Sequence, residues 1–76
     1  MKEAVEKIVN ALVDDKNAVE VSEEKGERAT VIKLRVASSD MGRIIGREGR
    51  TVKAIRSLLF AAGQKHGQRF VLDIVE

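Results

Sequence analysis

The chain has no cysteine, no tryptophan and no tyrosine, and its 76 residues include only one histidine and two phenylalanines. Without cysteine, neither disulfide bonds nor thiolate metal sites can support the fold. No apolar run approaches the roughly 20 residues of a membrane-spanning helix, and no signal peptide is recognisable. We therefore expect a cytoplasmic protein without a membrane segment, a metal site or a cofactor.

The same shortages argue against an enzyme. The sequence contains no Gly-Lys-Ser/Thr phosphate loop and no cluster of metal ligands. The single histidine, His66, lies between glycines near the end of a predicted helix, where a surface position or a contact with the helix dipole is the common role. With only Phe60 and Phe70 available, we also expect no aromatic surface for stacking bases, and therefore little sequence specificity toward a nucleic acid.

Charge is distributed unequally along the chain. Residues 1–27 carry four lysines and eight acidic residues, a net charge of −4, whereas residues 28–76 carry ten basic and four acidic residues, a net charge of +6. This polarity predicts one basic face for a polyanion and one acidic face for solvent or a partner.

The strongest signal is the stretch IIGREGRTVKAI at residues 44–55. Gly46 and Gly49 lie three apart between a short apolar run and an amphipathic helix. Glycine permits a positive φ and lets another chain approach closely. The N-terminus of the following helix would face this turn, and its free N–H groups favour an anion. Three cations stand close by in the sequence: Arg47, Arg50 and Lys53. Together these features predict a clamp for a nucleic-acid backbone.

Hydrophobic periodicity predicts three elements in the N-terminal half. Apolar residues recur at helical spacing over residues 2–14, which predicts an amphipathic helix with a core-facing stripe. Alternation over residues 18–24 and 28–37 predicts two antiparallel strands. The turn between them is expected at residues 24–27, with Gly26 at a positive φ. Lys33 and Arg35 are expected to face outward.

The C-terminal half is predicted to hold a short helix, a long helix and a strand. Residues 38–40 (Ser-Ser-Asp) are typical of an N-cap, in which a hydroxyl or carboxylate accepts the first helical N–H groups. A long helix follows over residues 50–65, with Gly63 and Gly67 at its end. Its inward face is expected to consist of Val52, Ile55, Leu58, Leu59 and Ala62. Residues 68–75 alternate as a final strand.

The stretch at residues 44–55 resembles the KH-domain signature Ile-Ile-Gly-x-x-Gly-x-x-Ile-Lys-x-Ile, with Val52 where isoleucine is usual. The predicted order α-β-β-α-α-β, with a helix and a strand before the KH core, resembles the type II arrangement of the small bacterial KhpA family. The resemblance spans the chain and implies a single domain over residues 1–76. It implies an α+β fold in which a three-stranded mixed sheet carries helices packed on one face.

The resemblance also implies a binding site for single-stranded RNA between the short helix, the glycine loop, the long helix and the neighbouring strand. The loop glycines would let the sugar–phosphate chain pass closely. Arg47 would face a phosphate, and Ile45 would form an apolar floor under the bases. The expected RNA-binding residues are Gly42, Arg43, Ile45, Gly46, Arg47, Glu48, Gly49, Arg50 and Lys53.

Glu48 departs from the common loop pattern, in which both central positions are basic or small. A carboxylate near phosphates disfavours binding by about 1 kcal/mol at exposed separations. We therefore expect weak, salt-sensitive binding by one copy, and useful affinity from two linked sites. The resemblance implies dimers, either with a second copy or with a larger KH-containing protein (KhpB, also called Jag or EloR). It further implies an RNA chaperone or post-transcriptional regulator.

Two other interpretations stay open at this point. The KH fold can serve mainly as an interaction or dimerisation module, a partner of a larger Jag-type protein with little RNA binding of its own. Alternatively, the two helices around the glycine turn can be compared with a helix-turn-helix that reads duplex DNA. The predicted first helix of that pair is very short and strands flank the pair, which disfavours the second interpretation.

Overall fold

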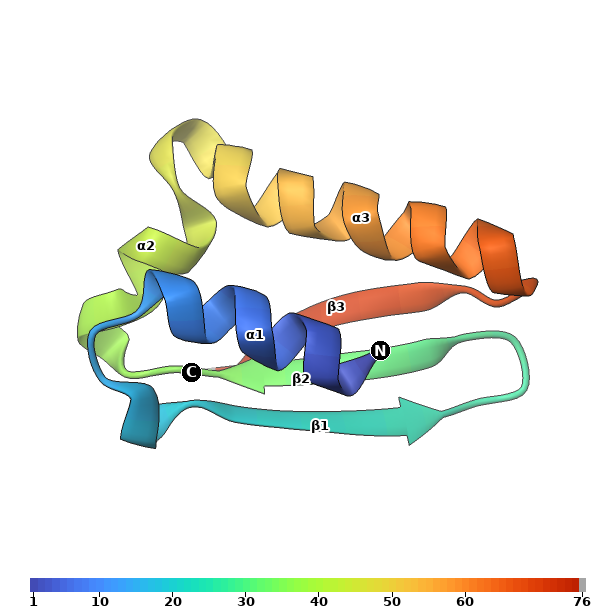
Figure 1. Cartoon of the computed structure of the whole chain (residues 1–76), viewed down its shortest axis with the longest axis horizontal. Coiled ribbons are helices and arrows are strands. Elements are labelled where there is room, and N and C mark those ends of the chain that lie inside the picture. The colour runs from blue at the N-terminus through green and yellow to red at the C-terminus, as the bar shows by residue number, and fades with distance from the viewer. Residues whose placement is uncertain (76) are drawn as a thin grey trace.

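The structure, a computed structural model, describes residues 1–75, so only the last residue of the predicted 1–76 domain lies outside it (Figure 1). The elements, in chain order, are α1 (Lys2–Leu12), β1 (Glu20–Lys25), β2 (Thr30–Arg35), α2 (Met41–Ile45), α3 (Arg50–His66) and β3 (Phe70–Val75). Short 3-10 turns lie in the connections at Lys16–Ala18, Ser38–Asp40 and Arg47–Gly49. The predicted α-β-β-α-α-β order is confirmed.

The strands form one mixed sheet in the order β1-β2-β3. β1 runs antiparallel to β2, with Glu20 opposite Arg35, and β2 runs parallel to β3, with Thr30 opposite Phe70. A parallel neighbour requires a long crossover, and the segment containing α2 and α3 supplies it. The sheet is therefore the mixed three-stranded sheet that the sequence predicts.

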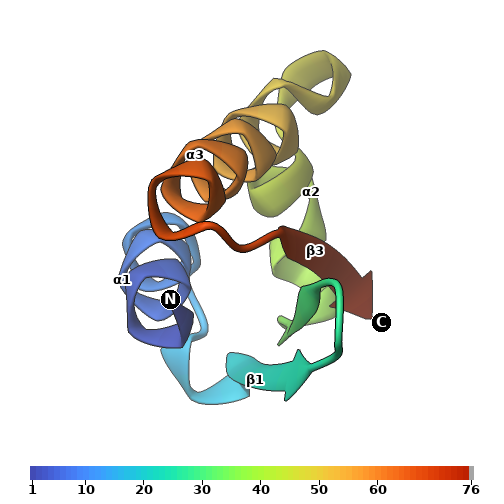
Figure 2. The ribbon, with the colours of Figure 1, turned by 90° about the vertical axis from the view of Figure 1, so that its right-hand side faces the viewer.

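The helices lie on one face of this sheet, with α1 beside β1 and α3 above β3 (Figure 2). The central strand alternates accordingly. Ile32 and Leu34 are buried under the helices, whereas Lys33 and Arg35 face outward as predicted. The outward ammonium group of Lys33 pairs with Glu24 at 2.9 Å.

The core fills the space between the helices and the sheet. Its buried apolar residues are Val5, Val9, Val13, Ile32, Leu34, Val36, Ile44, Val52, Ile55, Leu59 and Leu72. Full burial of an aliphatic side chain contributes about 1.5–3 kcal/mol. In a chain without disulfides, this cluster is the main stabilising feature, and it also fixes the positions of α2 and α3.

α1 ends two residues earlier than the periodicity predicts. Val13 remains buried at 4% exposure, but its backbone is extended, with φ −91° and ψ 156°. The N–H groups of Asp14 and Asp15 donate to the carboxylate of Asp40 instead of to helical carbonyls. A tertiary contact therefore ends the helix, although the apolar spacing continues through Val13.

Two glycines act differently from prediction. Gly26 does not have a positive φ. Its N–H donates to the carbonyl of Ala29 at 2.8 Å, and a Cβ there would approach that oxygen to 3.0 Å. Gly63 stays helical and buried, and a Cβ there would collide with the backbone carbonyl of Gln68. Gly67 does end α3 as predicted, in the left-handed region with φ 65°.

The inward face of α3 also differs at one position. Leu58 was expected in the core but is 60% exposed, whereas Ile55 and Leu59 are buried. Leu58 lies one turn beyond Ile55 on the flank of α3 that faces α1, and it lines an apolar groove between these two helices. The stripe of buried apolar residues on α3 is therefore narrower than the sequence predicts.

Candidate nucleic-acid interface

The glycine loop is a tight turn between α2 and α3. α2 ends at Ile45, and Gly46 then takes φ 77° and ψ 172°. A Cβ at Gly46 would collide with the hydroxyl of Thr51 and lie 2.7 Å from its Cβ. Gly49 has φ 74° and ψ 16°, with open space where a Cβ would stand. Both positions therefore favour glycine through the backbone, and only Gly46 also excludes a side chain through packing.

The start of α3 is open to a ligand. Gly49 is its N-cap residue and supplies no side-chain hydrogen bond, so the first N–H groups of this 17-residue helix face the loop without a side-chain partner. The N–H of Arg50 donates to the carbonyl of Arg47, but no side chain caps the helix start. The helix dipole and N–H groups at such an end together favour an anion. This is the arrangement that the motif predicts.

Glu48 is the only residue other than glycine with a positive φ in residues 1–75, at 57°. The left-handed region disfavours such a residue by roughly 1–2 kcal/mol. Its carboxylate lies 3.6 Å from the guanidinium of Arg50, and both side chains are largely exposed. Glu48 thus offsets part of the positive charge of the loop, and any anion that binds there would compete with Glu48 for Arg50.

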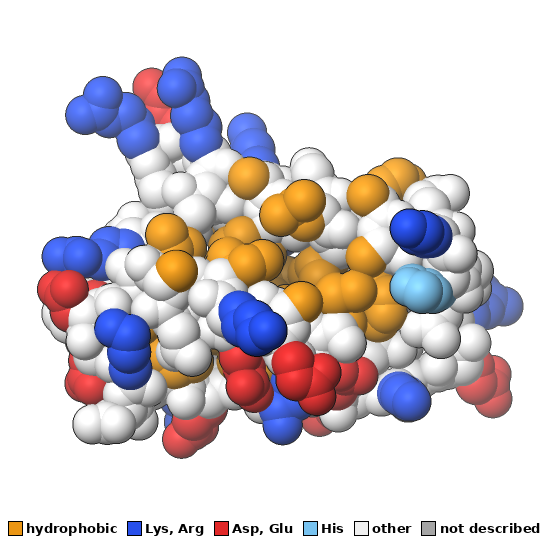
Figure 3. Space-filling view, viewed as in Figure 1, with side chains coloured by type: hydrophobic (Ala, Val, Ile, Leu, Met, Phe, Trp, Pro, Cys, Tyr) orange, Lys and Arg blue, Asp and Glu red, His pale blue; other side chains and the backbone are white. Residues whose placement is uncertain are grey.

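Two other cations near the loop, Arg47 and Lys53, have no such acidic partner within residues 1–75. Arg47 and Lys53 are exposed, and neither forms an ion pair within residues 1–75. Figure 3 shows Lys and Arg side chains projecting at the upper left, where the loop between α2 and α3 lies. The loop is therefore a positively charged projection.

The apolar residues around the loop divide between the core and the surface. Ile44, Val52 and Ile55 are buried and anchor both helices in the core. Ile45 points outward and is 40% exposed. A Cβ at Gly42 would meet no atom within 4 Å, so the surface beside Ile45 is open.

A hollow of about 500 Å³ lies between α3 and β3, and the sequence analysis does not predict it. It is lined by Arg56, Ser57, Phe60, Arg69, Phe70, Val71 and Leu72. Lys53, Arg56 and Phe60 follow one another at spacings of three and four, so they share one face of α3 that leads from the loop into the hollow. Phe60 is 62% exposed. One exposed aromatic ring therefore lies beside the hollow, and helical spacing is the signal in the sequence that points to it.

The family described as "KhpA/KhpB, KH domain" matches residues 2–74. The chain belongs to the KhpA/KhpB KH-domain family. The RNA-binding protein KhpA of Aquifex aeolicus is 45% identical over 76 residues, covering 100% of this chain and 96% of that protein. The RNA-binding protein KhpA of Halalkalibacterium halodurans is 46% identical, with 100% of both chains covered. The RNA-binding protein KhpA of Clostridium acetobutylicum is 44% identical, covering 99% and 100%.

No solved structure matched the chain in the corresponding comparison. Family membership and the order of elements agree, since this KhpA/KhpB domain has the type II KH fold with a helix and a strand before the core. Within residues 1–75, no helix is both long and apolar enough to cross a membrane, and no group of three acidic, histidine or cysteine residues is arranged to hold a metal ion.

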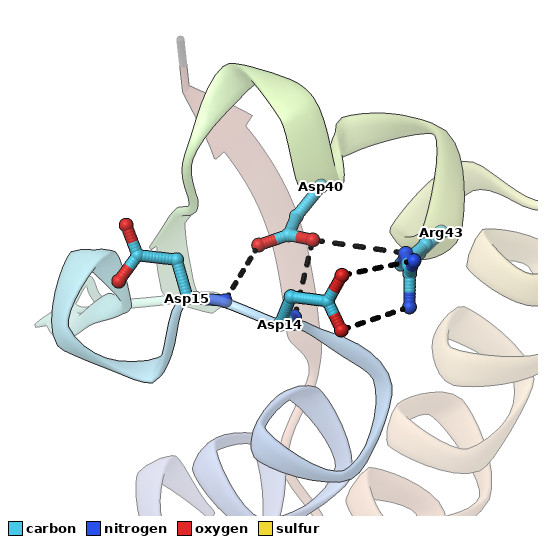
Figure 4. A network of polar contacts seen from close by, with 4 residues as sticks. All are labelled: Asp14, Asp15, Asp40 and Arg43. Atoms are coloured by element: carbon cyan, nitrogen blue, oxygen red, sulfur yellow. Dashed lines mark hydrogen bonds and ion pairs between the residues drawn. The ribbon is translucent and has the colours of Figure 1, made fainter.

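One further feature of this KhpA/KhpB domain is a polar network behind α2 (Figure 4). Asp40 is only 2% exposed, and its two carboxylate oxygens accept the N–H groups of Asp14 and Asp15, each at 3.1 Å. The N–H groups of Asp15 and Asp14 hold the pKa of Asp40 below its ordinary value. The predicted N-cap role of residues 38–40 is wrong, because no side-chain cap bond forms at either helix start and Asp40 bonds to the distant end of α1 instead.

The same network engages Arg43, which the sequence predicts as an RNA contact. Two guanidinium nitrogens of Arg43 meet the two carboxylate oxygens of Asp14, at 3.0 and 3.2 Å. Its Nε lies 3.7 Å from Asp40. Figure 4 shows the guanidinium directed at these carboxylates. Arg43 therefore differs from Arg47 and Lys53, since acidic side chains already occupy its donors.

Proposed function

We propose that the protein binds single-stranded RNA across its glycine loop, with low sequence specificity and without catalysis. The observation that carries this proposal is the combination of a left-handed glycine turn, an uncapped start of α3 and an unpaired Arg47 on one projection. The relatives that match over the full chain are named RNA-binding proteins, which supports RNA as the ligand.

In this proposal the sugar–phosphate chain passes over Gly46 and Gly49, where no Cβ stands in the way. A phosphate lies near the first N–H groups of α3, and Arg47 donates to it. Bases rest on Ile45 beside the open surface at Gly42. Arg43, Glu48, Arg50 and Lys53 surround this position, with Glu48 opposing the binding electrostatically.

The chain of nucleotides then continues along α3 toward the hollow beside β3. Lys53 and Arg56 line that path with positive charge, and Phe60 offers an exposed ring. Stacking of a base on an aromatic ring contributes about 1–3 kcal/mol and discriminates little between bases. Contacts of this kind account for affinity without sequence specificity, as expected for a cytoplasmic RNA chaperone or post-transcriptional regulator.

The second candidate function is an interaction module that pairs with another copy or with a larger KhpB/Jag/EloR-type protein. The apolar groove between α1 and α3 favours it, because Leu58 is 60% exposed beside Ile8 and Ala62. Hydrophobic side chains gather between these helices in Figure 3. Assembly and RNA binding use different surfaces, so both functions are compatible, and two linked sites would raise the affinity for RNA.

Fluorescence anisotropy with a short single-stranded RNA, the matched DNA and a duplex RNA, at two salt concentrations, tests the proposal. The double variant Arg47→Asp, Glu48→Asp keeps both glycines, and aspartate tolerates the left-handed conformation at position 48. We expect it to bind RNA at least about tenfold more weakly, because a charged hydrogen bond contributes about 1.5–3 kcal/mol and is replaced by repulsion. Lys7→Asp, an exposed change of the same charge on α1, is the control.

Equal binding by the wild type and the double variant, with an unchanged circular dichroism spectrum, would contradict the loop as the RNA site. Binding of the duplex in preference to single strands would contradict single-stranded RNA as the ligand. A protein that forms dimers but binds no RNA at low salt would leave the interaction module as its function.

A further inference from the structure

Arg43 differs from the other cations near the glycine loop because an acidic residue distant in the sequence engages both of its terminal nitrogens. Asp14 takes both terminal nitrogens of the guanidinium, and the buried Asp40 lies near the remaining Nε. Asp14 comes from the connection after α1 and not from the KH core. The acidic N-terminal part of the chain therefore reaches into the region where RNA is expected.

We infer that Asp14 is a positioning residue that restrains Arg43 and weakens the binding of RNA. This inference rests on the proposed function, since it assumes that RNA lies across the glycine loop. An RNA phosphate and the Asp14 carboxylate compete for the same two terminal nitrogens of Arg43, and in the free protein these nitrogens contact Asp14.

The geometry of the pair supports direct competition. The two parallel contacts to Asp14 occupy the edge of the guanidinium that binds a phosphate in the same forked manner. The adjoining edge of the guanidinium contains Nε, which lies 3.7 Å from the buried carboxylate of Asp40. A phosphate can therefore gain the forked contact with the two terminal nitrogens only after Asp14 is displaced.

The position of Arg43 supports an effect on RNA. Arg43 lies on α2, four residues before Arg47, and its neighbour Gly42 leaves open space on the surface. Its side chain is 53% exposed in spite of the ion pairs. Once released, a long and flexible side chain at this position reaches the same stretch of backbone that Arg47 contacts.

The backbone of Asp14 explains why the restraint is effective. Its N–H and that of Asp15 are both held by the buried carboxylate of Asp40. The Asp14 side chain is thus presented to Arg43 from a fixed point. Asp15 shares this anchoring, but its carboxylate points away from Arg43 and forms no ion pair within residues 1–75 (Figure 4).

The neighbouring aspartates offer a matched experiment on the full chain. Asp14→Asn and Asp15→Asn remove the same charge, one residue apart, and both keep the N–H that Asp40 accepts. Binding of a short single-stranded RNA is measured by fluorescence anisotropy over a series of salt concentrations. The two changes are repeated in an Arg43→Gln background, and thermal unfolding of every variant is recorded.

We expect Asp14→Asn to tighten binding about two- to fivefold beyond Asp15→Asn, the range that follows from the strength of exposed ion pairs. The plot of log affinity against log salt concentration should steepen by about 0.7, the value for one additional phosphate contact on a single strand. In the Arg43→Gln background the difference between the two aspartate variants should vanish. Asp14→Ser should tighten RNA binding to a similar extent, which would show that the effect comes from the loss of the carboxylate and not from the introduced asparagine.

The possible outcomes separate this inference from the proposed function. Equal affinities of the Asp14→Asn and Asp15→Asn variants, with wild-type binding intact, overturn the restraint alone. A gain from Asp14→Asn that persists without Arg43 also overturns it, because the effect would then be one of general charge. Failure of every variant and the wild type to bind RNA overturns both proposals together.

Discussion

Gly46 is the position at which the backbone and the packing both require glycine, so its replacement by alanine is a stringent test of the loop. Its φ of 77° and ψ of 172° lie in a region that is essentially restricted to glycine. Alanine in that region costs about 1–3 kcal/mol. The new Cβ would also lie 2.7 Å from the Cβ of Thr51 and 2.8 Å from its backbone nitrogen. Forcing a methyl group into such a contact costs about another 1–3 kcal/mol.

The expected loss is therefore about 2–6 kcal/mol in the free energy of unfolding. A domain of 76 residues has a total of roughly 4–11 kcal/mol. Gly46→Ala should accordingly lose a large share of its stability or be unfolded without denaturant. The measurement is urea-induced unfolding followed by circular dichroism. Transition midpoints are compared between variants whose unfolding free energy has the same slope against urea concentration.

Two neighbouring glycines provide graded controls. Gly49→Ala meets open space but retains a left-handed φ of 74°, so it should lose about 1–2 kcal/mol. Gly42→Ala lies within α2 with nothing near its Cβ, so it should gain roughly 0.5–1 kcal/mol. A Gly46→Ala protein no less stable than Gly49→Ala would refute the argument that Thr51 excludes a side chain at Gly46.

Three further predictions concern other parts of the molecule. Because the folded pKa of Asp40 lies below its ordinary 3.8, its carboxylate stabilises the fold above about that pH, and this contribution disappears as the pH falls through the folded pKa. Asp40→Asn should therefore have a lower melting temperature than the wild type at neutral pH, and its melting temperature should fall less when the pH is lowered further. An equal fall in the melting temperature of both proteins with pH would contradict this role of Asp40. Phe60→Ala should weaken RNA binding about fivefold or more with little change in melting temperature. Leu58→Ala, similarly exposed on the other flank of α3, should leave the affinity of the monomeric domain for a short RNA unchanged. Gly63→Ala should lower the melting temperature in thermal unfolding, since its Cβ collides with the carbonyl of Gln68, and an unchanged melting temperature would show that this contact can relax.

The features that the sequence predicts correctly depend on near neighbours in the chain. Positive φ at Gly46 and Gly49 follows from the need for a tight turn between two helices, and a hydrophobic pattern decides which side of each element is buried. The buried positions of Ile44, Val52 and Ile55 follow from the same periodicity. These signals are local, so they determine the order of elements and the position of the glycine loop.

The features that the sequence misses depend on partners far apart in the chain. Asp40 resembles a local N-cap, yet its carboxylate bonds to backbone groups 25 and 26 residues away. Arg43 resembles a free cation beside the loop, yet Asp14 holds it across 29 residues. A charged or polar side chain has several acceptable partners, and only the packing of α1 against the KH core decides which one lies within reach.

The hollow beside β3 and the exposure of Leu58 have the same origin. Periodicity assigns a side to each residue of α3, but it does not indicate where that helix lies relative to β3 and α1. The elements and the glycine turn follow from local patterns, because they depend on backbone sterics and on the spacing of apolar residues. Which charges lack a partner and which apolar side chains stay exposed depend on distances between elements, and no local pattern contains those distances.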